Sequence, residues 1–101
     1  LRYLRYRGEK LGINEYTITK IITMITTCEN KKLDPEAYNI NNDKYRSMDV
    51  GIMMINMYWH RHEVKLVDML DPFKNIDYGY KLFLEQGFEP WACAHKLGYV
   101  K

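Results

Sequence analysis

The feature that most constrains the fold is a stripe of apolar residues that recur at spacings of three and four. The stripe consists of Ile18, Ile21, Ile22, Ile25 and Cys28. Such spacings place the side chains on one face of an α-helix, and Asn14 just before them is a favourable N-cap residue. The β-branched residues would also suit a strand, but length and period favour a helix that ends near Glu29 or Asn30.

The second half of the chain contains further helix signals. Asp71 followed by Pro72 is a typical helix start, because Asp caps the helix and Pro is well tolerated at its first position. Gly87 is a typical stop. Pro90 opens a short helix over residues 91–97, which Gly98 ends. Residues 62–70 show helical spacing as well, at Val64, Val67 and Leu70.

A polar stretch separates these helical regions. Residues 39–43 read Asn-Ile-Asn-Asn-Asp, and Asn and Asp are turn formers, so irregular chain or a small hairpin is expected over residues 38–50. Residues 52–56, after Gly51, are expected to form a short buried helix or turn. The predicted fold class is therefore mostly α, of the α+β kind: a helical domain with a small polar β-wing.

Length and composition suit one domain over residues 1–101. The chain has 101 residues, of which 47% are hydrophobic, enough for a real core. No apolar run approaches the ~18 residues of a membrane span. The net charge is +2, and basic residues concentrate in the first ten positions. That basic terminus is either simply solvated, with Tyr3 and Tyr6 packed down, or contacts an anionic polymer such as glycan or nucleic acid.

The two cysteines and the first residue leave alternatives open. Cys28 and Cys93 either form one disulfide or remain as free thiols in apolar surroundings. The chain begins at Leu1, so it is either a mature form or a piece of a longer protein. For that reason the lack of an export signal says little about where the protein acts.

Glu29 is the first candidate catalytic residue. A carboxylate at the C-terminal end of a helix meets the negative end of the helix dipole, and apolar neighbours disfavour its charged form. Both effects raise the pKa, which suits a general acid that must hold a proton near neutral pH. A lone Glu on a helix end is, however, more often an ordinary surface residue.

The segment after Glu29 makes the catalytic interpretation stronger. In chain order it contains Pro35, Ala37, Asn39, Asn41, Asp43, Ser47, Asp49, Gly51, Ile52, Met53, Ile55 and Asn56. This order resembles lysozymes and the lysozyme-like lytic transglycosylases, especially compact bacterial or phage enzymes. Their acid Glu precedes an Asn-rich stretch and a Ser-x-Asp-x-Gly motif that ends in Asn. The segment Asp71 to Ile76 is similar to the family's Asp-Pro-aromatic-x-Asn-Ile helix start.

The resemblance implies a lysozyme-like catalytic domain that degrades peptidoglycan. It would cleave the β-1,4 bond between N-acetylmuramic acid and N-acetylglucosamine, with Glu29 as general acid and base. A lytic transglycosylase would release 1,6-anhydromuropeptides. In the alternative of a hydrolytic lysozyme, Asp49 would stabilise the oxocarbenium ion or act as nucleophile. A turn cap is the ordinary role of such an Asp.

Further site residues follow from the same resemblance. Ser47 and Asn56 would orient the sugar or the wing, and Trp91 would pack on Glu29 or serve only as core. Met54 stands where the family has Gln and cannot replace its hydrogen bonds. His95 stands where the family has Tyr and would contact substrate or simply lie at the surface. Asn30 stands where the family has a small residue after the acid. Tyr58 and Trp59 would either stack on the faces of sugar rings or belong to the core.

Other functions fit single features of the sequence. An inactive glycan-binding domain of the same fold is the main alternative, given Asn30 and Met54. His60 and His62 stand two residues apart and cannot share a helix face, so no metal and no cofactor is expected. A pI of about 8.5 argues against a nucleic-acid partner. The expected partners are peptidoglycan strands. The protein is expected to be a monomer or part of a larger protein. It is expected to act in the cell envelope or outside the cell, that is, in the periplasm, as a secreted protein or in a phage virion.

Overall fold

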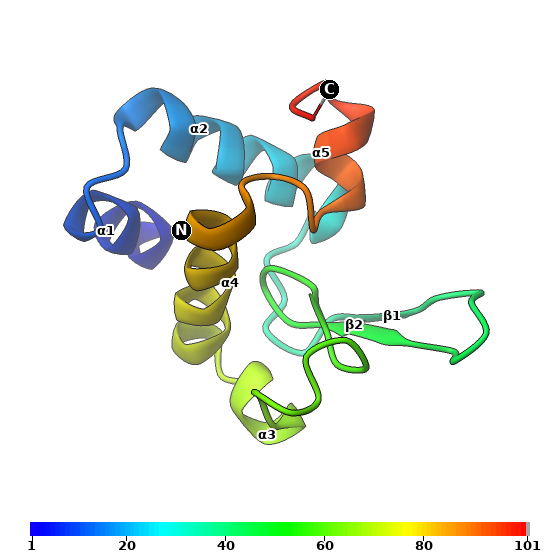
Figure 1. Ribbon diagram of the computed structural model, residues 1–101. Helices are drawn as coiled ribbons and strands as arrows, with labels where there is room; N and C mark the ends of the chain where they lie inside the picture. The colour runs from blue at the N-terminus through cyan, green and yellow to red at the C-terminus, as the bar shows by residue number, and fades with distance from the viewer. Residues whose placement is uncertain (101) are drawn as a thin grey trace.

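The computed structural model describes residues 1–100 of the chain, and Figure 1 shows their arrangement. This part of the chain forms five α-helices and a three-stranded antiparallel sheet, so the predicted α+β class with a mostly helical body is confirmed. The elements follow one another as α1 (Arg2–Lys10), α2 (Glu15–Met24), the π-helical turn η1 (Ile25–Glu29), β1 (Tyr38–Ile40), β2 (Met48–Val50), β3 (Ile55–Asn56), α3 (Leu66–Met69), α4 (Pro72–Gln86) and α5 (Ala92–Lys96).

The predicted helix around the apolar stripe is present, but its last turn differs. The Asn14 side chain accepts a hydrogen bond from the Thr17 amide at 2.8 Å, as expected of an N-cap. The helix then widens into the π-helical turn η1, in which the Asn30 amide donates to the Ile25 carbonyl at 2.7 Å. Single π turns of this kind often occur at functional sites. Glu29 is the last residue of the turn.

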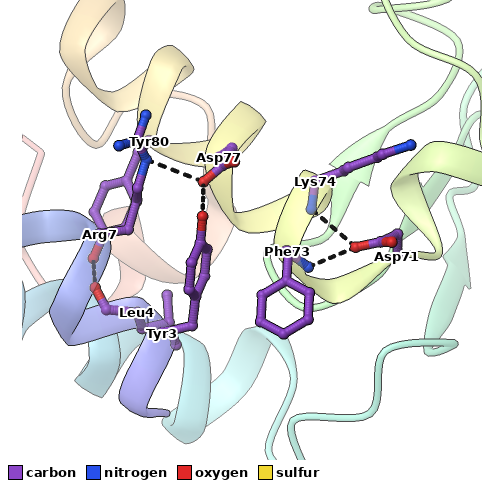
Figure 2. A network of polar contacts seen from close by, with 8 residues as sticks. All are labelled: Tyr3, Leu4, Arg7, Asp71, Phe73, Lys74, Asp77 and Tyr80. Carbon is purple, nitrogen blue, oxygen red and sulfur yellow. Dashed lines mark hydrogen bonds and ion pairs between the residues drawn. The ribbon is translucent and has the colours of Figure 1, made fainter.

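Helix α4 begins and ends at the predicted residues. The Asp71 carboxylate accepts hydrogen bonds from the amides of Phe73 and Lys74 (Figure 2), and Gly87 follows the helix with φ +65°. The inner face of α4 is buried and carries an amide as well as apolar side chains: Asn75, Ile76, Gly79, Tyr80 and Leu82.

The N-terminal segment forms the helix α1, which was not predicted from the sequence, and Arg2, Arg5 and Lys10 on it are exposed. Leu4 is fully buried, and its carbonyl accepts a hydrogen bond from the Tyr80 hydroxyl of α4. Figure 2 shows the second link between α1 and α4: the Tyr3 hydroxyl donates to Asp77 at 2.7 Å, and Arg7 pairs with the same carboxylate at 3.2 Å. Of the two tyrosines expected to pack down, Tyr6 is instead exposed.

One other segment differs from expectation, since the helix predicted over residues 62–70 is limited to α3 and residues 58–63 form turns instead. Of the short buried helix or turn predicted after Gly51, the turn is present over residues 51–54, and the chain then enters β3.

The predicted polar wing is the small sheet, whose strands lie in the order β1-β2-β3. In Figure 1 the β1–β2 hairpin extends away from the helices, and β1 is exposed along its whole length. The wing is anchored by one apolar pair, since Val50 lies opposite Ile55 and both are 1% exposed. The polar residues of the wing are therefore held by one another more than by the core.

The two cysteines form a disulfide, which decides between the alternatives that the sequence left open. Cys28 and Cys93 have Cα atoms 6.0 Å apart, and the bridge joins the π-helical turn to α5. Within residues 1–100, no helix has both the length and the apolar character needed to cross a membrane.

Candidate active site

A cleft of about 590 Å³ lies between the wing and the helical body. Five wing residues line one side of it: Asn41, Asp43, Ser47, Asp49 and Asn56. The helical side consists of Glu29, Leu82, Gln86, Pro90, Trp91 and Ala92, and the segment around β3 adds Met54, Ile55, Trp59 and His60. The cleft thus brings together most of the residues that the sequence singled out, and it is large enough for sugar units of a polymer.

Glu29 is half-buried at the end of η1 and faces the cleft. Its Oε1 accepts a hydrogen bond from the Cys93 amide of α5 at 2.8 Å. Burial raises the pKa of Glu29 above its ordinary value, and the negative charge of Asp49 raises it further. The Cys93 amide and the Lys96 ammonium oppose that rise in pKa. The net result is a carboxyl group that keeps its proton to higher pH than a surface Glu does.

Asp49 occupies a different environment on the wing. The Asn41 amide donates to its Oδ2 at 3.1 Å, and the Asn56 amide donates to its Oδ1 at 2.9 Å. Both carboxylate oxygens are thus acceptors of side-chain N–H groups. The cleft therefore contains two carboxyl groups, one in a partly apolar setting and one in a polar, hydrogen-bonded setting.

Ser47 and Asn56 mainly support the wing. Ser47 is 2% exposed, and its hydroxyl donates to Asp43 and accepts from Asn41 and Asn56, each at 3.1 Å. Asn56 uses its carbonyl as well, accepting from the Trp59 amide at 2.9 Å. These contacts agree with the predicted role of orienting the wing, and the predicted role of orienting the sugar stays a prediction. Asn41 and Asp43 belong to the same network, although the sequence did not indicate them as site residues.

Two buried asparagines fix the wing to the helices. Asn75 is fully buried on α4, donates to the carbonyls of Val50 and Met69 at 2.9 Å, and accepts from the Met53 amide at 2.8 Å. Asn30 donates to the Gly51 carbonyl at 3.1 Å and so links the turn of Glu29 to the end of β2. A side chain at Gly51, where φ is +84°, would collide with Asn75. This close contact explains why a glycine follows the strand of Asp49.

Trp91 and Met54 also line the cleft. Trp91 is 3% exposed, and its indole N–H donates to the Met53 carbonyl at 2.7 Å. It lines the same cleft as Glu29. Met54 has an uncommon positive φ of +50° and lines the cleft with a side chain that offers no amide.

Trp59 lies at the cleft with 60% of its surface exposed. It stands edge-on to Tyr58, which itself stacks on Tyr45 with ring centroids 4.3 Å apart. Exposed aromatic faces of this kind suit the apolar faces of sugar rings.

His95 is the one residue of the predicted site that does not line the cleft. It is exposed on α5, where its ring contacts the Glu89 carbonyl at 2.9 Å. His60 does line the cleft, although the sequence indicated it only as part of a rejected metal site. Across residues 1–100, the His, Cys, Asp and Glu side chains nowhere form a group of three or more that could hold a metal ion.

No family model, no curated protein and no solved structure matches this chain.

Proposed function

We propose that the protein cleaves the glycan strands of peptidoglycan at the β-1,4 bond between N-acetylmuramic acid and N-acetylglucosamine. The observation that carries the proposal is Glu29, a carboxyl group with a raised pKa in a cleft that also contains Asp49. A protonated carboxyl group can donate to a departing sugar oxygen, which is the demanding step in glycoside cleavage. The order of motifs from Glu29 to Asn56, which resembles lysozymes and lytic transglycosylases, supports the same substrate.

The reaction begins when Glu29 gives its proton to the glycosidic oxygen. The bond from that oxygen to C1 of the muramic residue breaks, and positive charge develops at C1. The Asp49 carboxylate across the cleft stabilises that charge electrostatically. The Glu29 carboxylate then takes a proton from the attacking group, which restores the starting state of the enzyme.

The attacking group is proposed to be the 6-hydroxyl of the same muramic residue. Its oxygen bonds to C1 and yields a 1,6-anhydro end, so the reaction is a lytic transglycosylation. Both oxygens of Asp49 are engaged by wing amides, which suits a fixed charge better than a nucleophile that must form a bond. There are two alternatives to a lytic transglycosylase. One is a hydrolytic lysozyme that uses Asp49, and the other is a glycan-binding domain without turnover.

The place of action is proposed to be the cell envelope or the outside of the cell. The disulfide between Cys28 and Cys93 gives weak support, because disulfides persist mainly in oxidising compartments.

The test is mass spectrometry of the fragments released from purified peptidoglycan by the wild type and by Glu29→Gln. Anhydro ends that disappear in the variant are expected, with a fall in rate of about 10²–10⁴-fold. Glu9→Gln, at an exposed position on α1 far from the cleft residues in sequence, is the matched control and should keep full activity. Reducing ends would indicate a lysozyme. Binding without any release would leave only the glycan-binding alternative.

A further inference from the structure

His60 lines the cleft, but the reaction proposed above does not use it. Its backbone is anchored at the end of β3, since the His60 amide donates to the Asn56 carbonyl at 3.2 Å. Its Nδ1 lies 3.0 Å from the Tyr78 hydroxyl of α4. The contact links α4 to the turn that follows β3, two segments that α3 separates in the chain.

The contacts of the Tyr78 hydroxyl determine which of its neighbours donates a hydrogen bond and which accepts one. The Tyr78 hydroxyl also lies 2.7 Å from Oε2 of Glu63. The pKa of Glu63 is lowered, first by the hydrogen bond from Tyr78, so Glu63 is ionised and can only accept. Burial raises the pKa of Tyr78, which keeps its proton. The single Tyr78 proton therefore goes to Glu63, and its oxygen is left to accept from His60.

This arrangement selects one tautomer of His60. Burial lowers the pKa of His60, so its imidazole is neutral near pH 7. A neutral imidazole carries one proton, and the Tyr78 oxygen requires it on Nδ1. The other ring nitrogen, Nε2, is then a bare acceptor on the opposite edge of the ring from Tyr78. His60 lines the cleft, and because Nδ1 is engaged with Tyr78, Nε2 is the ring nitrogen left to contact a ligand.

We infer that His60 is a substrate-positioning residue, whose Nε2 accepts a hydrogen bond from an O–H or N–H group of an N-acetylhexosamine unit bound in the cleft. Glu63 and Tyr78 act through His60 by holding its tautomer and its orientation. This inference rests on the proposed function, because it assumes that the ligand is a glycan. Among the wing residues of the cleft, the amide groups of Asn41 and Asn56 are already engaged with the wing itself. A free acceptor at His60 would add a direct polar contact to the substrate.

The first measurement is the tautomer of His60 in the free protein, from long-range ¹H–¹⁵N correlation spectra of the imidazole near pH 7. Protonated and bare ring nitrogens have well separated ¹⁵N shifts. We expect a proton on Nδ1 and a bare Nε2. In Tyr78→Phe, which keeps the aromatic ring but lacks the hydroxyl, the preference should weaken. A wild-type protein with its proton on Nε2 would overturn the inference, whatever the protein binds.

The second measurement is the affinity for a tetramer of N-acetylglucosamine, titrated in a Glu29→Gln background so that it is not cleaved. His60→Phe retains an aromatic ring and lacks the acceptor, and its affinity should fall by roughly three- to tenfold, the effect of one hydrogen bond. Equal affinities for the two proteins would overturn the contact while leaving the proposed function intact. Failure of the Glu29→Gln protein itself to bind the tetramer or peptidoglycan would instead overturn the proposed function, and the contact with it.

Discussion

The helical body and the wing are stabilised in different ways, although both contribute to one cleft. The body has an apolar core, with Ile18, Met24, Ile25 and Tyr80 fully buried. The wing has an exposed outer strand, and its inner residues are joined by side-chain hydrogen bonds around Ser47 and Asp49. Burial stabilises the body through the hydrophobic effect, whereas exchange with water leaves only a modest net gain for each hydrogen bond of the wing.

The same contrast separates the two carboxyl groups of the cleft. Glu29 comes from the body, and its burial there favours its protonated form. Asp49 comes from the wing, where two amides donate to it. A cleft between a packed region and a hydrogen-bonded region can therefore hold two carboxyl groups of different character. This is the arrangement that acid-catalysed glycoside cleavage requires.

The largest effect is expected where the body anchors the wing. Asn75→Ala leaves the carbonyls of Val50 and Met69 and the Met53 amide without their partners inside the protein. We expect a fall in the free energy of unfolding of about 3–5 kcal/mol, because buried groups without hydrogen bonds are costly. Denaturant titration followed by circular dichroism measures it.

Asn41→Ala is the matched variant on the wing, since it also removes an amide with several contacts. Water can replace those contacts, so the loss should be only about 1 kcal/mol. Equal losses in the two variants would mean that the wing and the body are not stabilised in different ways.

The features of the fold that were predictable depend on residues close together in the chain. The Asn14 cap, the Asp71-Pro72 start and the Gly87 stop each act within one helical turn, and all three were predicted. Helix α1 was missed, and some of its contacts are with a distant element. The Leu4 carbonyl accepts a hydrogen bond from the Tyr80 hydroxyl of α4, and a Cβ at Gly8 would lie 2.8 Å from the same hydroxyl. No short-range signal in the first ten residues reveals those contacts.

The site was predictable to a similar degree. The chain order of Glu29, Ser47, Asp49 and Asn56 indicated residues that do line one cleft. His95 was expected there because it aligns with a family residue, but the short helix α5 turns it toward Glu89. The contact of His60 with Tyr78 joins positions 18 residues apart, and only the packing of α4 brings them together. The sequence also left the disulfide open, because Cys28 and Cys93 lie 65 residues apart in the chain and only the fold brings them together.

An intermediate effect is expected from neutralising the carboxylate on the wing. Asp49→Asn should lower the rate of glycan cleavage by about tenfold, less than Glu29→Gln, because in the proposed reaction Asp49 supplies charge and transfers no proton. The negative charge of Asp49 raises the pKa of Glu29, so its removal should also lower that pKa. Glu29 must be protonated to act as an acid. The alkaline limb of the pH–rate profile should therefore move to lower pH.

Asp43→Asn is the control for that experiment. Asp43 lines the same cleft and carries the same charge, but its contacts are with Ser47. It should leave the alkaline limb where it is in the wild type. If Asp49→Asn were as inactive as Glu29→Gln, the two carboxyl groups would be equally necessary, and a lysozyme that uses Asp49 as nucleophile would replace the transglycosylase.

The smallest effect is expected on the free energy of unfolding, which the burial of ionised Glu29 lowers. The native pKa of Glu29 lies above its ordinary value of 4.5, so between those two values the native state binds more proton than the unfolded chain. The free energy of unfolding therefore falls as the pH rises through this window, and the loss is complete above the native pKa. Glu29→Gln has no charge to bury and still offers an oxygen to the Cys93 amide. Its thermal midpoint should equal that of the wild type at about pH 4 and exceed it by roughly 1–4 °C at about pH 8.

Calorimetric scans of the wild type and Glu29→Gln at both pH values measure this difference, and Glu9→Gln controls for the loss of one negative charge at an exposed position. A gain seen at both pH values alike would trace to general charge rather than to burial of Glu29. A Glu29→Gln protein that is less stable than the wild type at about pH 8 would show that the carboxylate is well solvated in the native cleft. In that case the contrast between a packed body and a hydrogen-bonded wing would no longer support the proposal that Glu29, rather than Asp49, is the acid.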